Sequence, residues 1–174
     1  MTDTGKDIKT RAARVRWLFL DVDGTLTDGR MHIGKGGALT RSYHTLDGHG
    51  MRRFMAAGGG IAIITAAAED DSIRYRMEDL GVRHVHIAVG DKLAKVKEVL
   101  AAEALDVSQT AYVGDDVQDL AALEFVGASG LACAPKTAMP EVLAAAHYIP
   151  ARPAGGGAVR EVIDLIMAQW QNSA

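Results

Sequence analysis

Residues 15–24 read VRWLFLDVDG, an apolar run that stops at two aspartates and a glycine. A short apolar run that ends in a polar turn is typical of a strand buried on both faces of a sheet. Four later stretches share this pattern: GIAIITA (60–66), HVHIAV (84–89), TAYVGDD (110–116) and GLACA (130–134). We therefore predict five short buried strands.

Segments with helical periodicity separate these runs. They cover residues 48–57, 69–80, 92–104 and 118–124, and two more helices are expected within 139–149 and 158–170. Strands that alternate with helices indicate an α/β fold, with a doubly wound parallel sheet covered on both faces. The polar residues 1–15 are expected to form a solvated leader, and residues 16–174 a single domain.

One stretch breaks the alternation. The segment GRMHIGKGGALTRSYHT (29–45) alternates polar and apolar residues around several glycines, which predicts a β-hairpin inserted after the first strand. Only about 40 residues separate Asp23 from Thr65, and fewer than 30 separate Thr65 from Lys92. Neither gap can hold a further folded domain.

The composition excludes several classes of function. The 174 residues are 48% hydrophobic and 24% charged, which is typical of a globular domain. A net charge of -3 and 5% aromatic residues argue against nucleic-acid binding, so a small molecule is the expected partner. No stretch approaches the roughly 20 apolar residues of a membrane span, and the N-terminus lacks the apolar segment of a signal peptide. The single cysteine, Cys133, permits no internal disulfide, and we expect a cytoplasmic protein.

Polar side chains follow four of the predicted strands. Asp21 and Asp23 come after the first strand, Thr65 ends the second, Lys92 follows the third, and the pair Asp115-Asp116 follows the fourth. Ligands of open parallel sheets sit beyond the carboxyl ends of the strands, so these groups are expected in one crevice. Carboxylates that close repel one another unless a cation neutralises them, and hard oxygen ligands favour magnesium.

This set of groups suits phosphoryl transfer. Asp21 can attack phosphorus and become an aspartyl-phosphate, while Asp23 can protonate the leaving oxygen and then accept a proton from water. Lys92 and Thr65 would bind the phosphoryl oxygens, and Gly24 allows a sharp turn after Asp23. Taken singly, each residue has a structural alternative, such as a turn for Asp-x-Asp-Gly, or a helix cap for Asp115-Asp116. Their joint occurrence in order favours the catalytic interpretation.

At these residues the sequence resembles the haloacid dehalogenase superfamily of phosphatases. FLDVDGTLTDG resembles its first motif, IIT with Thr65 the second, GDKLAKV with Lys92 the third, and GDDVQDL the fourth. The resemblance implies Asp21 as nucleophile and Asp23 as acid/base. It implies that Asp21, the main-chain carbonyl of Asp23 and Asp115 hold Mg²⁺, and two further aspartates support the site: Asp116 and Asp119.

A closer resemblance covers residues 16–167. The elements LTDGR, YHTLDGHGMR, RMEDLGV and AGGGAVREVIDLI are similar to the 3-deoxy-D-manno-octulosonate 8-phosphate phosphatases, a subfamily without a cap domain. That subfamily includes phosphatases of nine-carbon sugar acids, such as N-acylneuraminate 9-phosphate. The resemblance implies a phosphorylated sugar acid as substrate and a homotetramer in which hairpins assemble. The residues expected to bind the substrate are Gly24, Asp47, Gly48, Arg76 and Arg160.

Three positions depart from the subfamily pattern. A Gly-Arg pair usually follows the second-motif threonine, where this chain has Ala66-Ala67. Leu46 stands where an arginine often precedes Asp-Gly, and residues 87–90 replace a usual Gln-Gly element. Missing guanidinium groups matter because arginine binds carboxylates bidentately. The cations that could replace them are Arg30, Lys35, Arg41, Arg74, Arg76 and Arg160.

Two functions of other classes remain open. A receiver-like phospho-acceptor also uses an acidic cluster with a threonine and a lysine, although it lacks an acid/base aspartate like Asp23. A non-catalytic oligomerising module would be compatible with the lost arginines. Magnesium-dependent release of phosphate from p-nitrophenyl phosphate would separate these hypotheses.

Overall fold

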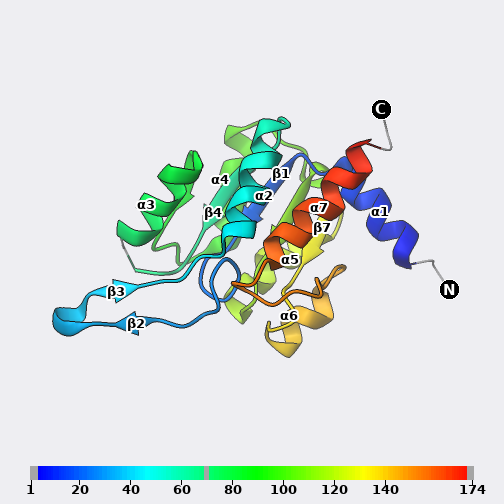
Figure 1. The fold of residues 1–174 in the computed structure, drawn as a ribbon. Coiled ribbons are helices and arrows are strands. Elements are labelled where there is room, and N and C mark those ends of the chain that lie inside the picture. The colour runs from blue at the N-terminus through cyan, green and yellow to red at the C-terminus, as the bar shows by residue number, and fades with distance from the viewer. Residues whose placement is uncertain (1–3, 69–70, 172–174) are drawn as a thin grey trace.

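The computed structural model describes residues 4–68 and 71–171 (Figure 1). Its centre is a parallel sheet with the order β5-β4-β1-β6-β7, in which β1 pairs in register with both β4 and β6. The strands are β1 (Trp17–Leu20), β4 (Gly60–Ile64), β5 (His84–His86), β6 (Thr110–Val113) and β7 (Leu131–Cys133). The predicted doubly wound parallel sheet is therefore confirmed.

Helices cover both faces of this sheet, as Figure 1 shows. Alternate strand residues point to opposite faces, so Leu18 and Leu20 pack with α1, α2, α3 and α7, whereas Phe19 packs with α4, α5 and α6. The helices are α1 (Thr4–Arg14), α2 (Thr45–Ala56), α3 (Asp71–Leu80), α4 (Lys92–Ala102), α5 (Val117–Gly127), α6 (Pro140–Ala145) and α7 (Ala158–Gln171), with a short 3₁₀ turn at Val107–Gln109. The two residues before α3 that were predicted to be helical lie outside the described residues.

The predicted hairpin extends away from the sheet (Figure 1). Strands β2 (His32–Ile33) and β3 (Leu39–Thr40) pair antiparallel, and a 3₁₀ turn at Lys35–Gly37 connects them. Gly36 and Gly37 have φ values of 75° and 83°, which L side chains rarely adopt. In the described residues, only this hairpin and α2 separate the first strand from β4, so no cap domain lies there.

Residues 4–15 differ from the prediction of a solvated leader. Residues Thr4–Arg14 form α1, which packs beside α7. Ala12 and Val15 are fully buried in the core, and Arg11 Nη1 donates a hydrogen bond to the carbonyl of Gly127 over 2.8 Å. Lys9 and Arg14 are exposed on the outer face of this helix, whereas Arg11 and the small apolar residue Ala12 face the rest of the fold.

Helix ends shift where polar side chains cap them. Helix α2 begins three residues before the predicted start because His44 Nδ1 accepts a hydrogen bond from the Leu46 N–H over 3.1 Å.

The segment between α6 and α7 adds only a single parallel bridge to the sheet, between Tyr148 and Cys133. Among the described residues, no helix combines the length and apolar character that crossing a bilayer requires.

Candidate active site

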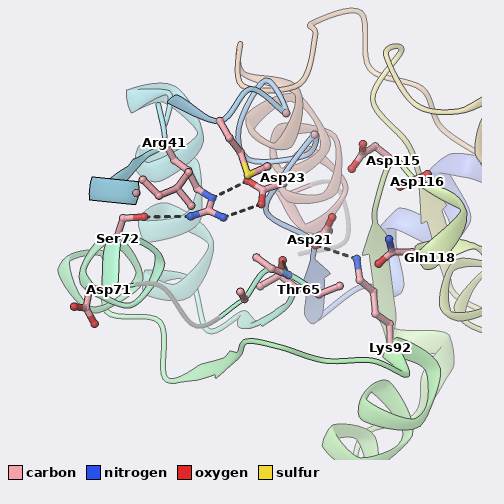
Figure 2. Close-up of a pocket in the computed structure, with 18 of the residues that line it drawn as sticks. Asp21, Asp23, Arg41, Thr65, Asp71, Ser72, Lys92, Asp115, Asp116 and Gln118 are labelled. Carbon is pink, nitrogen blue, oxygen red and sulfur yellow. Dashed lines mark hydrogen bonds and ion pairs between the residues drawn. The ribbon is translucent and has the colours of Figure 1, made fainter. Parts of the chain in front are cut away.

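Five of the predicted site residues meet at the carboxyl ends of the central strands. Asp21 follows β1, Thr65 follows β4, and Asp115 comes two residues after β6. Because these strands are parallel and in register, their ends lie at one edge of the sheet. Asp23 and Lys92 join them, and all five line a cleft of about 1030 Å³ (Figure 2). The fold thus gathers residues that are far apart in the sequence.

Lys92 lies between two buried carboxylates at the base of this cleft. It is the first residue of α4, whose N-terminus is capped by Asp91. Its Nζ is 3.0 Å from Asp21 Oδ1 and 2.7 Å from Asp119 Oδ1. Burial lowers the pKa of Lys92, but the charges of the two carboxylates outweigh burial and raise this pKa above its ordinary value. Lys92 is therefore a fixed cation.

Asp119 is fully buried and engages both carboxylate oxygens. Oδ1 accepts hydrogen bonds from Lys92 Nζ and from the Tyr112 hydroxyl, each over 2.7 Å. Oδ2 accepts from the backbone N–H groups of Asp115 and Asp116, over 3.1 and 3.2 Å. A carboxylate has about four lone-pair sites, and these four donors fill them. Asp119 therefore orients Lys92 and the loop after β6, with no oxygen left for a ligand.

The remaining carboxylates fit a divalent cation. Asp21, Asp115 and Asp119 each have an oxygen within 4.8 Å of the other two. Burial, followed by the charge of Asp119, raises the pKa of Asp21 to about 7 and that of Asp115 to about 6. Asp21 Oδ1 is buried yet accepts no well-directed hydrogen bond. Since Asp119 is saturated, Asp21 and Asp115 are the side chains that suit Mg²⁺, which prefers carboxylate oxygens.

The loop after β1 approaches Asp115 closely. Gly24 has φ +84°, and a Cβ added there would lie 2.0 Å from Asp115 Oδ2. Thr25 Oγ1 donates a hydrogen bond to Asp115 Oδ1 over 3.1 Å. Glycine is thus required at position 24 both for its backbone conformation and for space. Gly24 also lines the cleft, as predicted.

Asp23 is held by an arginine to which the motifs assign no role. Arg41 Nε lies 2.8 Å from Asp23 Oδ1 and Arg41 Nη2 lies 3.0 Å from Asp23 Oδ2, so the pair is bidentate (Figure 2). Arg41 directly follows β3, and its side chain is 2% exposed. The sequence marks this residue only as one of six candidate cations. Arg41 meets Asp23 because the hairpin returns the chain to the cleft, and no local sequence pattern predicts that path.

Thr65 and Asp116 combine local structural roles with positions on the cleft. Thr65 is buried, and its Oγ1 accepts a hydrogen bond from the Ala67 N–H over 3.2 Å. Asp116 caps α5 by accepting a hydrogen bond from the Val117 N–H over 2.7 Å, and it also lines the cleft. Its position therefore agrees with the helix-cap interpretation as well as with a place at the site. The other described lining residues that the motifs did not indicate are Gly29, Met31, Gly37, Ala38, Leu39, Arg41, Ala68, Asp71, Ser72 and Gln118.

Two predicted substrate residues, Asp47 and Arg160, lie outside the cleft and join α2 to α7. Asp47 is buried in α2, and its Oδ1 accepts a hydrogen bond from the Arg160 N–H over 2.7 Å, in the first turn of α7. The Arg160 side chain pairs with Asp164 on its own helix, Nε to Oδ2, over 2.7 Å. Asp47 therefore acts as a helix-capping carboxylate in this chain, and its contact with the substrate stays a prediction.

The other two, Gly48 and Arg76, pack helix α2 against α3. A Cβ on Gly48 would lie 2.4 Å from Arg76 Nη2, so the glycine provides the room in which the guanidinium sits. Arg76 Nη1 pairs with Asp79 over 2.9 Å. Neither residue lines this cleft, and their contact with the substrate stays a prediction.

Comparisons with known proteins agree with this geometry. No protein-family model matches the chain. The 3-deoxy-D-manno-octulosonate 8-phosphate phosphatase of Yersinia pestis is 37% identical over 161 residues, which cover 92% of this chain and 84% of that enzyme. The chain belongs to the 3-deoxy-D-manno-octulosonate 8-phosphate phosphatase family. The corresponding enzyme of Escherichia coli K12 is 34% identical over the same share of both chains.

Solved structures support the family assignment. A haloacid dehalogenase superfamily (subfamily III A) hydrolase of Legionella pneumophila has a TM-score of 0.92 at 35% identity, over 98% of this chain and 91% of that one. The family's enzyme from Moraxella catarrhalis, solved with magnesium, phosphate and 3-deoxy-D-manno-octulosonate, has a TM-score of 0.91 at 29% identity. That match covers 96% of this chain and 94% of the other.

The departures from the family pattern lie in different places. Ala66 and Ala67 line the cleft directly after Thr65, so small apolar side chains stand where the family pattern has Gly-Arg. Leu46 is absent from the cleft lining and lies near Gly157, at the start of α7. The first departure therefore alters the cleft wall, and the second alters the packing beside α7.

Proposed function

We propose that this chain is a magnesium-dependent phosphatase that hydrolyses 3-deoxy-D-manno-octulosonate 8-phosphate through an aspartyl-phosphate on Asp21. The observation that carries the proposal is the cleft in which Asp21 and Asp115 lie beside the fixed cation Lys92, in a chain of this family. Asp21, Asp115 and the main-chain carbonyl of Asp23 would hold Mg²⁺. When bound, the ion would supply positive charge opposite the phosphoryl oxygens.

The reaction has two steps. In the first, an Asp21 carboxylate oxygen forms a bond to phosphorus, the ester P–O bond breaks, and Asp23 gives a proton to the departing sugar oxygen. In the second, water attacks phosphorus, its proton passes to Asp23, and the bond to Asp21 breaks. The sum consumes one water and releases the sugar acid and phosphate.

Other groups hold the phosphoryl group in line. Lys92 and the Thr65 hydroxyl would bind its oxygens, together with backbone N–H groups of the loop that contains Gly24. Asp119 would not contact the phosphoryl group, because all its lone-pair sites already have donors. It would act by holding Lys92 in place. Asp116 would support the loop as the α5 cap.

A panel assay tests the substrate. Purified protein with Mg²⁺ is assayed against phosphorylated metabolites that include eight- and nine-carbon sugar acids and p-nitrophenyl phosphate. We expect the highest kcat/KM for 3-deoxy-D-manno-octulosonate 8-phosphate. If sugar acids rank no higher than generic monoesters, the substrate proposal is wrong while the chemistry stands. A persistent phosphoprotein without turnover would instead indicate a phospho-acceptor, and no reaction with any ester would indicate a non-catalytic module.

One observation favours a second substrate. Ala66 and Ala67 leave the cleft wall small and uncharged where the family pattern has an arginine. A bulkier nine-carbon sugar acid, such as N-acylneuraminate 9-phosphate, would find more room there. In the same panel, a higher kcat/KM for the nine-carbon ester would establish this alternative.

We also propose a cytoplasmic homotetramer. The hairpin residues Met31 and Ile33 are 57% and 73% exposed, and burial of such side chains between subunits would remove apolar surface from water. Cys133 is a buried free thiol, which suits a reducing compartment. Light scattering of the purified protein tests the tetramer, and cell fractionation tests the location.

A further inference from the structure

Arg41 occupies an unusual place for a charged side chain. Its side chain is 2% exposed, and burial of a guanidinium is costly unless it is paired. One ion-pair partner is Asp23, whose carboxylate is 29% exposed and opens onto the cleft. The Arg41 guanidinium is thus enclosed by protein, whereas the Asp23 carboxylate is open to the cleft.

The pair fixes the plane of the Asp23 carboxylate. Two parallel N–H···O bonds, of 2.8 and 3.0 Å, leave a carboxylate little rotational freedom. On its other edge, Arg41 Nη1 lies 3.4 Å from Ser72 Oγ in α3. The guanidinium therefore connects the end of the hairpin, helix α3 and the loop after β1, and it presents Asp23 from that frame.

The cleft has one other cation among its described lining residues, and that cation serves a different group. Lys92 lies between Asp21 and Asp119. We propose that Arg41 is a positioning residue for the reaction, which holds the Asp23 carboxylate towards the leaving-group oxygen. This inference rests on the proposed function, because it assigns acid/base chemistry to Asp23.

Leaving-group dependence tests the role of Arg41. A sugar or other alkyl oxygen needs a proton to depart, whereas p-nitrophenolate departs without one. We expect Arg41→Gln to lower kcat for an alkyl phosphate about 10- to 100-fold with KM nearly unchanged, a part of the usual general-acid contribution. The loss for p-nitrophenyl phosphate should stay below about threefold. Arg41→Lys, which keeps the charge but not the bidentate geometry, should fall between wild type and Arg41→Gln.

Controls separate positioning from folding. Arg53 forms an ion pair with Asp164 away from the cleft, Nη1 to Oδ1 over 3.1 Å, so Arg53→Gln should leave both rates unchanged. Thermal unfolding of each variant checks the fold, and Arg41→Lys provides the test if Arg41→Gln does not fold.

A double-mutant cycle decides whether Arg41 acts through Asp23. In the Asp23→Asn background, the further change Arg41→Gln should cause no additional loss with the alkyl ester. Equal losses on both esters, a change mainly in KM, or losses that multiply in the double variant would overturn the inference. These results would leave the proposed function standing. Absence of phosphatase activity in the wild type would instead overturn the proposed function.

Discussion

Buried and half-buried aspartates in two regions of the molecule have different surroundings. Asp21 and Asp115 lie in the cleft, and Asp47 lies where α2 meets α7. Burial raises the pKa of all three carboxyls. Asp47 Oδ1 accepts a hydrogen bond from a backbone N–H at a helix N-terminus, whereas Asp21 and Asp115 have oxygens within 4.8 Å of each other and of Asp119. The neighbouring carboxylates, and not burial, distinguish the pair that a cation would complete from a structural carboxylate.

The largest contrast should come from removal of the charge at Asp21. Asp21→Asn should lower kcat at least about 10⁴-fold, because it removes the proposed nucleophile. The fold should persist, since the substitution keeps the shape and relieves crowding with Asp119. Single-turnover assays and thermal unfolding measure the two effects. Activity within tenfold of wild type would remove Asp21 from the reaction.

Magnesium should distinguish the two regions next. At 100 times its Kd, the ion should stabilise the wild type by about 2.7 kcal/mol, or roughly 5–10 °C in Tm, relative to the EDTA-treated protein. Asp115→Asn should abolish this shift, and the matched Asp47→Asn should keep it. An undiminished shift in Asp115→Asn would place the cation elsewhere.

The contact between α2 and α7 should show the reverse pattern. Asp47→Ala removes a buried acceptor from the first turn of α7, and should cost about 1–2 kcal/mol of stability. The kcat of the folded variant should stay within about twofold of wild type, because Asp47 does not line the cleft. Chemical denaturation and steady-state kinetics test this together. A large loss in kcat with unchanged stability would instead support the predicted substrate role of Asp47.

The smallest effect concerns Glu161 in α7. Its carboxylate accepts from the Tyr148 hydroxyl and from the N–H groups of Ala151 and Arg152. Burial opposes ionisation, but these hydrogen bonds prevail and hold the pKa of Glu161 below its ordinary 4.5. Its stabilisation is therefore present above pH 4.5 and is lost as the pH falls through the lowered value.

The corresponding variant is Glu161→Gln. Allowing for solvent screening, it should cost about 0.5–1 kcal/mol at pH 7, and this cost should disappear once the pH has fallen through the lowered pKa of Glu161. Denaturation at several pH values measures the difference. A cost that is independent of pH would show that charge is irrelevant at this position.

The parts of the fold and site that sequence predicts are those with local signals. Short apolar runs that stop at polar residues identify the strands, and the strand ends place Asp21, Thr65 and Asp115 at one edge. The sharp turn expected after Asp23 likewise predicts the role of Gly24. These inferences need no knowledge of how distant helices pack.

The sequence is least informative where the packing of distant segments decides the structure. The sequence predicts a substrate role for Asp47 and Gly48, but it does not indicate that α2 begins before them and directs Asp47 at α7. The basic N-terminal residues suggest solvent, but α1 buries Ala12 on its other face. Arg41 reaches Asp23 only because a hairpin returns the chain to the cleft.

The most direct test of the account is a crystal structure of the protein grown with Mg²⁺ and trifluoroberyllate, a mimic of a phosphoryl group on a carboxylate. We predict beryllium bound to a carboxylate oxygen of Asp21, with the metal ion contacting both Asp21 and Asp115. An adduct on another residue, or a metal ion that touches only one of these two carboxylates, would contradict the account.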